Sequence, residues 1–522
     1  MKDIYCSYYT ESEDITSYMV SKMGISENDL VLEPSAGKGT FIDEILKRKI
    51  KIRIDALDIN EDAILTMKKK YSNISNVSVR LTDTLFDEIL DDYANYEIWL
   101  KNTDILLDEQ LDLFSSYGGH YDKVIGNPPY GAWQDTKKRE LLKKKYIGQY
   151  VKETYSLFLL RSLSVLKKGG RLSFIIPDTF LFLNMHEKLR KILLTNTKIE
   201  EILIFPSKFF PGVSFGYSNL SIITLEKCDR DEALKNTVRI IKGFNSSAEF
   251  EDVLRNKFQN HHKTYKLKQY DVFTTEKSRF ILANNDVSVM IDLSEKKLGD
   301  VASIVTGFYS GNNKKFICSK NEKIKNSKGY RVIDANKIVG TTSLTGIEGV
   351  DEAYVPYIKS SSTTRYKRRD DEWFVRWDSK TVQFYNEDRK ARFQNAQYYF
   401  KKGIAIPMIK SREIKATLME NRVFDQSIVG IFPNDEKDMY YILALMNSNV
   451  INRLIHIINP TANNSSNYVK QLPYKIPVRK DRIKIEENVK KILSLDIVSD
   501  EDMIEILHKQ NDELIEKAYM QM

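Results

Sequence analysis

The residues best suited to chemistry form one short segment, Asn127-Pro128-Pro129-Tyr130, which directly follows a predicted strand at residues 122–126. The lone pair of a planar exocyclic amine is delocalised, so well-placed acceptors are needed to pull its nitrogen toward tetrahedral geometry. The Asn127 side-chain oxygen and the Pro128 carbonyl could be these acceptors. Proline holds its backbone rigidly, which fixes the direction of the carbonyl. Tyr130 would supply a flat face on which a base can stack. The segment therefore indicates a site that activates a planar amine.

A second segment, residues 31–41, reads Val-Leu-Glu-Pro-Ser-Ala-Gly-Lys-Gly-Thr-Phe. The pattern predicts a strand, a glycine-containing turn and the start of a helix. Small residues let a ligand approach the backbone closely, and the amides at a helix N-terminus can bind a carboxylate. We expect this turn to bind a cofactor through Glu33, Pro34, Ser35, Ala36, Gly37, Gly39 and Phe41, with Asn127 close by.

Acidic residues follow the next predicted strands. Asp58, with Ile59 after it, lies about twenty residues beyond the glycine turn, where a carboxylate can accept hydrogen bonds from both ribose hydroxyls of a nucleoside cofactor. Two residues could accept a hydrogen bond from the amino group of the cofactor's adenine. Asp83 follows the better strand pattern, whereas Asp104 lies at a more usual distance before the next strand. Both remain candidates.

The elements that position these residues alternate between short apolar runs and helical stretches over roughly the first 225 residues. This alternation predicts a parallel sheet covered by helices on both faces. The clearest predicted strands are residues 30–33, 54–59, 121–126 and 172–177. Beyond Cys228 the alternation is lost. We therefore predict two domains, residues 1–230 with an α/β fold and residues 231–522 with a mixed α+β fold.

The order of these segments resembles the gamma-order amino-methyltransferases, and among them the TaqI-like N6-adenine DNA methyltransferases of restriction-modification systems. The resemblance implies a Rossmann-like methyltransferase sheet that binds S-adenosyl-L-methionine, followed by a C-terminal target-recognition domain. It implies that Glu33 binds the methionine amino group of the cofactor and that Thr10, within Tyr9-Thr10-Glu11, lies near the cofactor carboxylate. Phe210, directly before Pro211, would pack against a flipped-out adenine.

A basic and aromatic segment, residues 359–377, stands out in the second predicted domain. Cations can bind phosphates, and arginine can also read guanine edges in the major groove. The chain has 80 Lys and Arg against 72 Asp and Glu, and the net charge of +8 suits a polyanionic partner. We expect double-stranded DNA to contact Arg365, Lys367, Arg368, Arg369 and Arg376. A solvated basic face is the alternative interpretation of this segment.

The composition argues against several other classes of protein. No apolar run approaches the roughly 18 residues of a membrane span, so we expect a cytoplasmic protein without a membrane partner. The three cysteines, Cys6, Cys228 and Cys318, are too far apart in the sequence to predict a disulfide framework or a zinc site, and no metal is expected. None of them lies in a Pro-Cys motif, which argues against C5-cytosine methylation.

The expected activity is direct transfer of a methyl group from S-adenosyl-L-methionine to the N6 amine of a flipped-out adenine in DNA. The enzyme would act as a monomer on DNA, and a separate cognate restriction endonuclease is a possible partner. Asn127 favours adenine over the N4 amine of cytosine. The alternatives are methylation of RNA adenine, of cytosine N4 or of protein glutamine, and a non-catalytic DNA specificity subunit. The last is disfavoured because every required catalytic position is filled.

Overall fold

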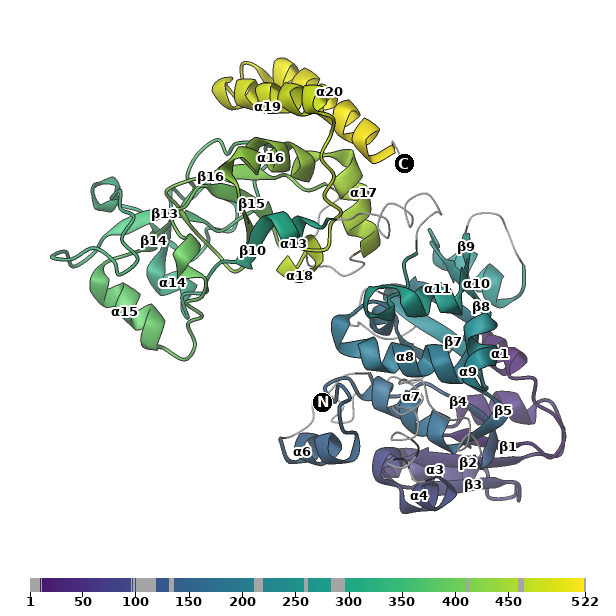
Figure 1. The fold of residues 1–522 in the computed structure, drawn as a ribbon. Helices are drawn as coiled ribbons and strands as arrows, with labels where there is room; N and C mark the ends of the chain where they lie inside the picture. The colour runs from purple at the N-terminus through teal and green to yellow at the C-terminus, as the bar shows by residue number, and fades with distance from the viewer. Residues whose placement is uncertain are drawn as a thin grey trace. The chain divides into compact units, whose positions relative to one another are not determined.

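The chain folds into two compact units, Met1–Phe280 and Ile281–Met522, drawn as ribbons in Figure 1. The computed structural model describes residues 10, 12–94, 96, 99, 119–130, 136–210, 219–257, 262–282, 296–409, 413–458 and 464–520. Asp104 and the residues that directly follow Phe210 lie outside the described residues. Each unit contains its own sheets and its own buried core.

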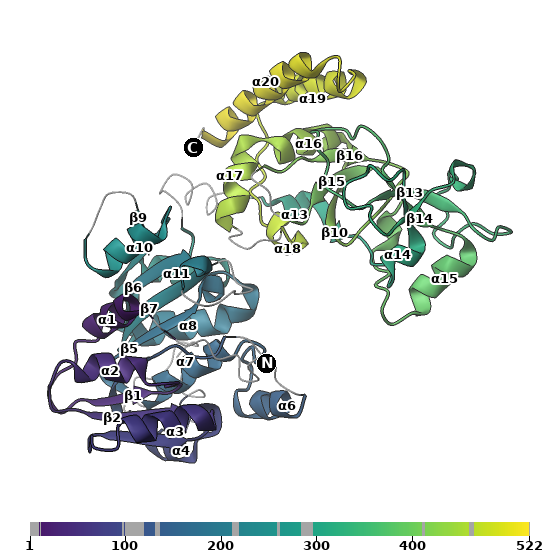
Figure 2. The same ribbon diagram turned by 180° about the vertical axis from the view of Figure 1, so that it is seen from behind.

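A nine-stranded sheet is the framework of the first unit. Its strands are β1 (Leu30–Glu33), β2 (Arg53–Asp58), β3 (Val77–Leu81), β4 (Tyr121–Gly126), β5 (Leu166–Pro177), β6 (Thr197–Pro206), β7 (Asn219–Lys227), β8 (Thr237–Lys242) and β9 (Lys263–Lys268). They lie in the order β3-β2-β1-β4-β5-β7-β6-β8-β9 (Figures 1 and 2), and β7 and β9 run antiparallel to their neighbours. The order reverses between the parallel neighbours β1 and β4. Open α/β sheets bind ligands at the carboxyl ends of such a pair.

Helices cover both faces of this sheet. The helices of the first unit are α1 (Glu13–Lys22), α2 (Thr40–Leu46), α3 (Glu61–Lys70), α4 (Glu88–Tyr93), α6 (Thr136–Lys145), α7 (Thr154–Val165), α8 (Glu187–Asn196), α9 (Arg230–Lys235), α10 (Ser247–Leu254) and α11 (Gln269–Thr274). Because crossovers between parallel strands are right-handed, α2 and α3 cover one face while α7 and α8 cover the other. α1 packs on α2 and α10. Every residue of α7 is buried, including Arg161.

The boundary between the two units lies 50 residues later than the predicted boundary after residue 230. β8 pairs with β6 in parallel register, with Ile202 opposite Ile240, and β9 pairs with the other side of β8. The alternating pattern fades there because β9 is a sheet edge on which Lys263, Lys266 and Lys268 are exposed. Lysines on an edge strand discourage pairing with another chain. The sheet therefore continues where the apolar signal stops.

The second unit contains two sheets around an aromatic core. One sheet has the order β10-β18-β15-β16, with β10 at Ala302–Thr306, β18 at Ile428–Pro433, β15 at Gly403–Pro407 and β16 at Thr417–Met419. The other has the order β12-β11-β14-β13-β17, with β12 at Arg331–Val332, β11 at Ile317–Ser319, β14 at Trp373–Arg376, β13 at Tyr354–Ile358 and β17 at Val423–Phe424. Phe308, Trp377 and Tyr385 are buried between the elements of this unit. The predicted mixed α+β architecture is confirmed.

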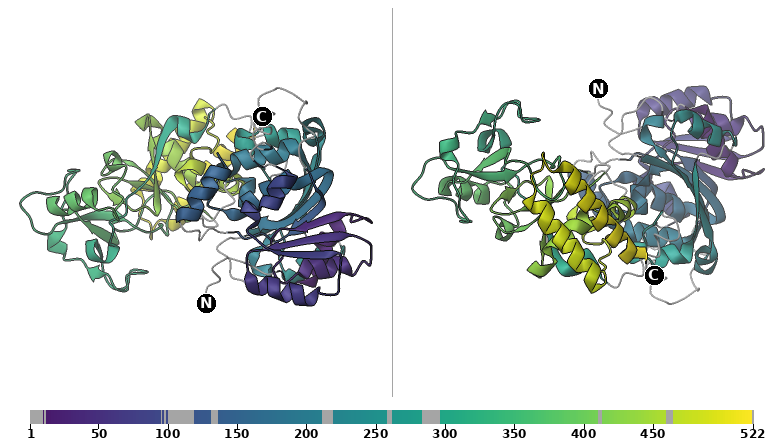
Figure 3. Two further views of the ribbon diagram at one scale, coloured as in Figure 1. Left: turned by 90° about the horizontal axis from the view of Figure 1, so that it is seen from below. Right: turned by 90° about the horizontal axis from the view of Figure 1, so that it is seen from above.

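The helices of the second unit include a C-terminal group. They are α13 (Leu298–Val301), α14 (Asn313–Phe316), α15 (Ser379–Glu387), α16 (Met439–Asn447), α17 (Asn449–Ile458), α18 (Ser466–Val469), α19 (Arg479–Ser494) and α20 (Glu501–Met520). Figure 3 shows α19 and α20 side by side, and both contact α16. Across the part of the chain that the structure describes, no helix combines the length and the apolar character needed to cross a membrane.

Candidate functional site

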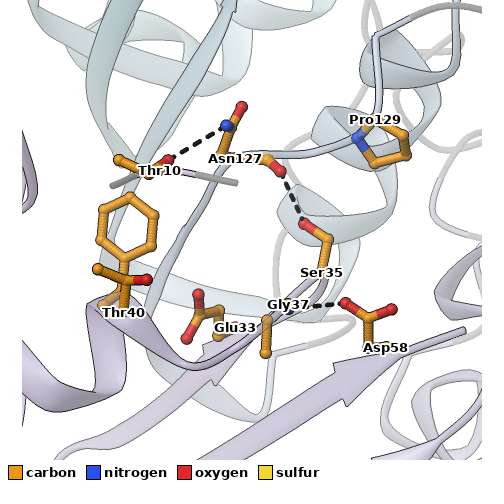
Figure 4. Close-up of a pocket in the computed structure, with 10 residues that line it drawn as sticks. Thr10, Glu33, Ser35, Gly37, Thr40, Asp58, Asn127 and Pro129 are labelled. Carbon is orange, nitrogen blue, oxygen red and sulfur yellow. Dashed lines mark hydrogen bonds between the residues drawn. The ribbon is translucent and has the colours of Figure 1, made fainter. Parts of the chain in front are cut away.

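A pocket lies at the carboxyl ends of β1, β2 and β4, where the strand order reverses (Figure 4). In that view Glu33 and Asp58 lie on one side of the pocket and Asn127 and Pro129 on the other. Its lining consists of Thr10, Glu33, Ser35, Ala36, Gly37, Thr40, Phe41, Asp58, Asn127 and Pro129. All of these except Thr40 are predicted site residues. The sheet thus brings together residues that are up to 119 positions apart, from Thr10 to Pro129.

The glycine turn is connected to the end of β2 by backbone and side-chain hydrogen bonds. The Gly37 amide donates to Asp58 Oδ2 at 2.7 Å, and the Asn60 amide donates to Asp58 Oδ1 at 2.8 Å. Asn60, and not Asp58, is the N-cap of α3. A carboxylate oxygen has a second lone pair, and Asp58 can therefore accept further hydrogen bonds from a ligand in the pocket.

Gly39 ends the glycine turn, has a φ of +79° and precedes α2. A Cβ atom at this position would lie 2.3 Å from the Tyr71 hydroxyl. That hydroxyl lies 2.8 Å from the Gly39 carbonyl oxygen and 2.9 Å from Asp43 Oδ1. Gly39 therefore has both a left-handed backbone and no space for a side chain.

Gly39→Ala is expected to lower the free energy of unfolding by about 2–4 kcal/mol, because backbone strain and the clash with Tyr71 add together. Urea unfolding of the whole chain measures this loss. The matched control is Gly169→Ala, since Gly169 has a φ of +76° but no atom within 4 Å of the added Cβ. It should lose only about 1 kcal/mol, from backbone strain alone. Equal losses in the two variants would mean that Tyr71 moves aside without cost.

Glu33 is a buried carboxylate that faces the pocket without a cation. Its side chain is 2% exposed, and its Oε2 atom has no hydrogen-bond partner among the described residues. Burial raises the pKa of Glu33 well above its usual range, the carboxylates of Asp58 and Asp43 raise it further, and Lys70 opposes them. A buried carboxylate is stable as an ion only when it is paired. The pocket therefore suits a ligand that brings a positive charge to Glu33.

Asn127 is fixed from three sides at the opposite wall. Its Nδ2 atom donates to Thr10 Oγ1 at 3.2 Å, and its backbone oxygen accepts from Ser35 Oγ at 3.2 Å. The Tyr130 hydroxyl donates to Asn127 Oδ1 at 2.7 Å. The proposed amine acceptor thus already accepts one hydrogen bond. Tyr130 is fully buried, so the face predicted for base stacking is covered in this structure.

The backbone of the loop is supported from α7. The Thr154 hydroxyl donates to the Pro129 carbonyl oxygen at 2.7 Å, and Pro128 is buried in the same loop. Thr154 is a supporting residue that sequence reasoning missed, and no local pattern marks it. Thr40 could have been found, because it is the first residue of the helix that follows the glycine turn.

Asp178 is a second residue that sequence reasoning missed. It directly follows β5, whose carboxyl end lies beside that of β4. Burial raises the pKa of Asp178 to about 7, and Asn219 Nδ2 donates to its carboxylate at 3.0 Å. Acids with raised pKa values at the ligand-binding edge of a sheet are common in functional sites. The available signal was an aspartate at the end of a continuous apolar strand.

Gly39, Pro128 and Tyr130, described above, are not among the residues that line the pocket, and four further predicted residues also lie outside it. Asp83 accepts from the Leu85 amide at 3.1 Å and forms an ion pair with Lys138 at 2.7 Å. Pro34 is buried, and its carbonyl oxygen accepts a hydrogen bond from the Thr84 hydroxyl. Ile59 is half-buried beside Asp58. Phe210 follows β6 and is 2% exposed, so its ring is covered here.

The predicted DNA-binding cations of the second unit are mostly engaged within it. Arg365 forms ion pairs with Glu413 at 2.9 Å and with Glu505 at 3.3 Å. Arg376 forms an ion pair with Asp378 at 2.6 Å. Both arginines are only partly exposed, and their charges are balanced by carboxylates of the same unit.

The other three cations of that segment differ in exposure. Lys367 donates to the Leu493 carbonyl oxygen at 3.1 Å, and Arg368 donates to the Ser360 carbonyl oxygen. Both are partly buried, whereas Arg369 is exposed. The two tryptophans of this segment, Trp373 and Trp377, belong to the core. Arg369 is therefore the most accessible of the five predicted DNA-binding cations.

Comparisons with known proteins connect this chain to DNA modification systems. Residues 39–210 match the family model described as Eco57I restriction-modification methylase. The type II methyltransferase M.HindII of Haemophilus influenzae is 27% identical over 344 residues, which cover 60% of this chain and 56% of that protein. The adenine-specific methyltransferase BrxX of Escherichia coli is 22% identical over 366 residues, which cover 68% of this chain and 28% of that protein.

The fold has a solved counterpart in the type ISP restriction-modification enzyme LlaGI. The structure of a nuclease-deletion mutant of that enzyme, in complex with a DNA substrate mimic, aligns with a TM-score of 0.55 at 15% identity. The alignment covers 93% of this chain and 46% of that chain. The predicted Rossmann-like sheet with helices on both faces is confirmed. The chain spans about half the length of M.HindII and a smaller share of the other proteins compared.

Proposed function

We propose that this relative of the restriction-modification methyltransferases is a site-specific DNA methyltransferase acting on the N6 amine of adenine. One observation carries the proposal: Glu33, whose Oε2 atom has no hydrogen-bond partner among the described residues, and the Asn127 side chain line the same pocket. A cation-binding acid beside a fixed amide oxygen suits a charged methyl donor next to a planar amine. The relatives named as methyltransferases and the adenine-specific BrxX support this choice.

The residues present fit S-adenosyl-L-methionine. Glu33 would bind its ammonium group, and Asp58 would accept from its ribose hydroxyls. Thr10 would lie near its carboxylate, and the small residues between Ser35 and Gly39 would let it approach the backbone. Bound there, the cofactor would supply an electrophilic methyl group on a sulfonium. Asp83 and Asp104 remain the candidates for its adenine, and Asp83 would first have to release Lys138.

Asn127 would act on the target amine. An amine N–H would replace the Tyr130 hydroxyl at Asn127 Oδ1, while a second N–H would donate to the Pro128 carbonyl oxygen. The nitrogen lone pair would then be localised, and the amine would form a bond to the methyl carbon as the bond from that carbon to the sulfonium sulfur breaks, which leaves S-adenosylhomocysteine and a cationic amine. The surplus proton leaves the amine afterwards. No covalent bond to the enzyme is needed.

Base entry requires a rearrangement of the aromatic side chains. Tyr130 and Phe210 are both buried in the structure, yet the proposal assigns them to the two faces of the flipped-out adenine. When the Tyr130 hydroxyl leaves Asn127, its ring becomes available for stacking. The catalytic loop therefore exchanges one hydrogen-bond donor for another as the base enters.

Duplex DNA is the proposed substrate, and the second unit is proposed as its target-recognition domain. The enzyme would act as a monomer, and a separate restriction endonuclease could recognise the same sites. LlaGI, which shares the fold, was solved with a DNA substrate mimic. Among the predicted cations, Arg369 is exposed and would contact phosphate directly. Arg365, Lys367, Arg368 and Arg376 would position the segment, since they bind carboxylates and carbonyl groups within the unit.

The decisive experiment measures methyl transfer from labelled S-adenosyl-L-methionine to duplex DNA, RNA and protein in parallel. The proposal expects labelled DNA, and mass spectrometry of digested nucleosides should give N6-methyladenine. N4-methylcytosine would change the assigned base, and label in RNA or protein without label in DNA would reject the substrate. Long-read sequencing of DNA from a host that expresses the chain would then identify the methylated sites.

A further inference from the structure

Helix α6 concentrates positive charge directly after the catalytic loop. Its ten residues, Thr136–Lys145, read TKKRELLKKK and contain six cations and one carboxylate. This net charge of +5 compares with +8 for the entire chain. The helix begins six residues after Tyr130. Like charges one turn apart destabilise a helix, so this composition is unfavourable unless an anion neutralises it.

The inner side of α6 anchors the helix to the first unit. Leu142 and Tyr146 are fully buried, and the Tyr146 hydroxyl donates to the Leu85 carbonyl oxygen at 2.9 Å. Lys138 forms an ion pair with Asp83, and Lys145 forms one with Asp91, each at 2.7 Å. Asp83 follows the carboxyl end of β3, so α6 lies at the same edge of the sheet as the pocket.

The outer side of α6 carries two exposed lysines. Lys137 and Lys144 are exposed, and neither forms an ion pair with a residue that the structure describes. Leu141, which is 54% exposed, lies between them. Residues three and four positions apart share a helix face, so these three side chains form one stripe. Lys143 is exposed as well but pairs with Glu140 on the helix itself.

We propose that this outer face of α6, defined by Lys137, Leu141 and Lys144, binds the phosphate backbone of duplex DNA beside the base that enters the catalytic loop. The inference rests on the proposed function and names a DNA contact on the catalytic unit. Ten helical residues span about 15 Å, and duplex DNA presents roughly nine phosphates over that length. The charge density of α6 matches a polyanion of this kind.

The test replaces both exposed lysines, as Lys137→Gln together with Lys144→Gln, in the full chain. Binding is measured by fluorescence anisotropy over a series of salt concentrations. The probe is an unmethylated duplex that contains a target site identified by the methylation experiment. Each lost phosphate contact lowers the slope of log K against log salt by about 0.9. For the double variant, the magnitude of the slope of log K against log salt should therefore be smaller by nearly two than for the unaltered chain. The variant should also bind about tenfold more weakly near 0.15 M salt.

The matched control is the pair Lys68→Gln and Lys69→Gln at the end of α3. These lysines are also exposed and helical in the same unit. α3 returns from the carboxyl end of β2 to the amino end of β3, so they lie at the sheet edge opposite the pocket. The control should keep the slope and affinity of the unaltered chain. Circular dichroism would verify that both pairs of variants are folded.

The outcomes separate the inference from the proposed function. If the unaltered chain methylates duplex DNA and the α6 variant keeps its salt slope, the inference about α6 is wrong. The same conclusion follows if the α3 control loses as much slope as the α6 variant. If the unaltered chain neither binds nor methylates duplex DNA, the proposed function itself fails. A reduced slope for the α6 variant alone, together with methylation by the unaltered chain, supports both.

Discussion

Asn127→Ala is expected to reduce the rate of methyl transfer at least about 100-fold, which is the scale of removing one preorganised polar group from a reacting centre. The substitution deletes Oδ1, the atom that would accept from the target amine. Affinity for the cofactor should change little, because Glu33 and Asp58 provide the principal polar contacts expected for the cofactor. Single-turnover transfer of labelled methyl groups measures the rate, and calorimetric titration with S-adenosylhomocysteine measures binding.

The control for this variant is Asn76→Ala. Asn76 Nδ2 donates to the Ile52 carbonyl oxygen at 2.9 Å, before β3 and therefore at the opposite edge of the sheet. That variant loses a comparable amide hydrogen bond but should retain normal transfer. Near-normal activity of Asn127→Ala would contradict the amine-polarising role. Loss of cofactor binding would instead mean that Asn127 holds the pocket together, through Thr10 and Ser35.

Glu33→Gln is expected to weaken cofactor binding at least about 100-fold, because breaking a buried ion pair by removing one partner costs about 3–5 kcal/mol. Glutamine has nearly the same shape but cannot balance an ammonium charge. Calorimetric titration with S-adenosylhomocysteine, which carries the same amino group, measures the loss. Glu44→Gln on α2 is the matched control, since Glu44 pairs with Lys47 on its own helix. It should bind as the unaltered chain does.

The same variant should have the opposite effect on the ligand-free protein. The pKa of Glu33 is raised in the folded state, so the unfolded chain loses the Glu33 proton at a lower pH than the folded chain does. The free energy of unfolding therefore falls as pH rises from the ordinary glutamate pKa toward the folded-state pKa. Glu33→Gln removes this destabilisation. Urea unfolding should therefore show the variant to be more stable than the unaltered chain, with a larger difference at pH 8 than at pH 5. A variant that is less stable at both pH values would mean that Glu33 is a structural residue.

Cofactor affinity of the unaltered chain should also depend on pH. Below its raised pKa, Glu33 is protonated and cannot balance a cation. Affinity should therefore increase with pH through that pKa, for as long as the ligand's amino group stays protonated. In Glu33→Gln this increase should disappear, because no titrating carboxyl group remains at the position. Titrations at several pH values compare the two proteins directly.

Local patterns were sufficient to predict the sheet and much of the pocket. The strands at β1 and β4 were predicted at their observed positions, since buried parallel strands are nearly continuous apolar runs. Parallel strands place their carboxyl ends at one edge, so the residues after β1, β2 and β4 meet there by topology alone. Nine residues predicted from the sequence line the observed pocket, and all except Thr10, which precedes α1, lie at or after these strand ends. Their chemical roles are tested by the variants above.

Side-chain partners distant in sequence could not be predicted. Nothing near Tyr130 indicates that its hydroxyl binds Asn127, because both the burial of the ring and its rotamer depend on the packed unit. The basic segment at residues 359–377 gave a strong sequence signal, yet Arg365 is neutralised by Glu505, 140 positions away. Charge in a sequence predicts an exposed cation only when no distant acid folds against it. At Lys137 and Lys144 no such acid is found among the described residues.

The continuation of the central sheet through β8 and β9 has a practical consequence for dividing the chain. A fragment that ended at residue 230 would leave the β6 edge unpaired, with buried residues such as Ile202 and Leu203 beside it. Open apolar edges recruit strands from other molecules, so that fragment would aggregate during expression. A fragment that extends to Phe280 keeps the lysine-bearing β9 as its outermost strand. The isolated catalytic unit should therefore be produced with those last 50 residues, whose charges protect it from self-association.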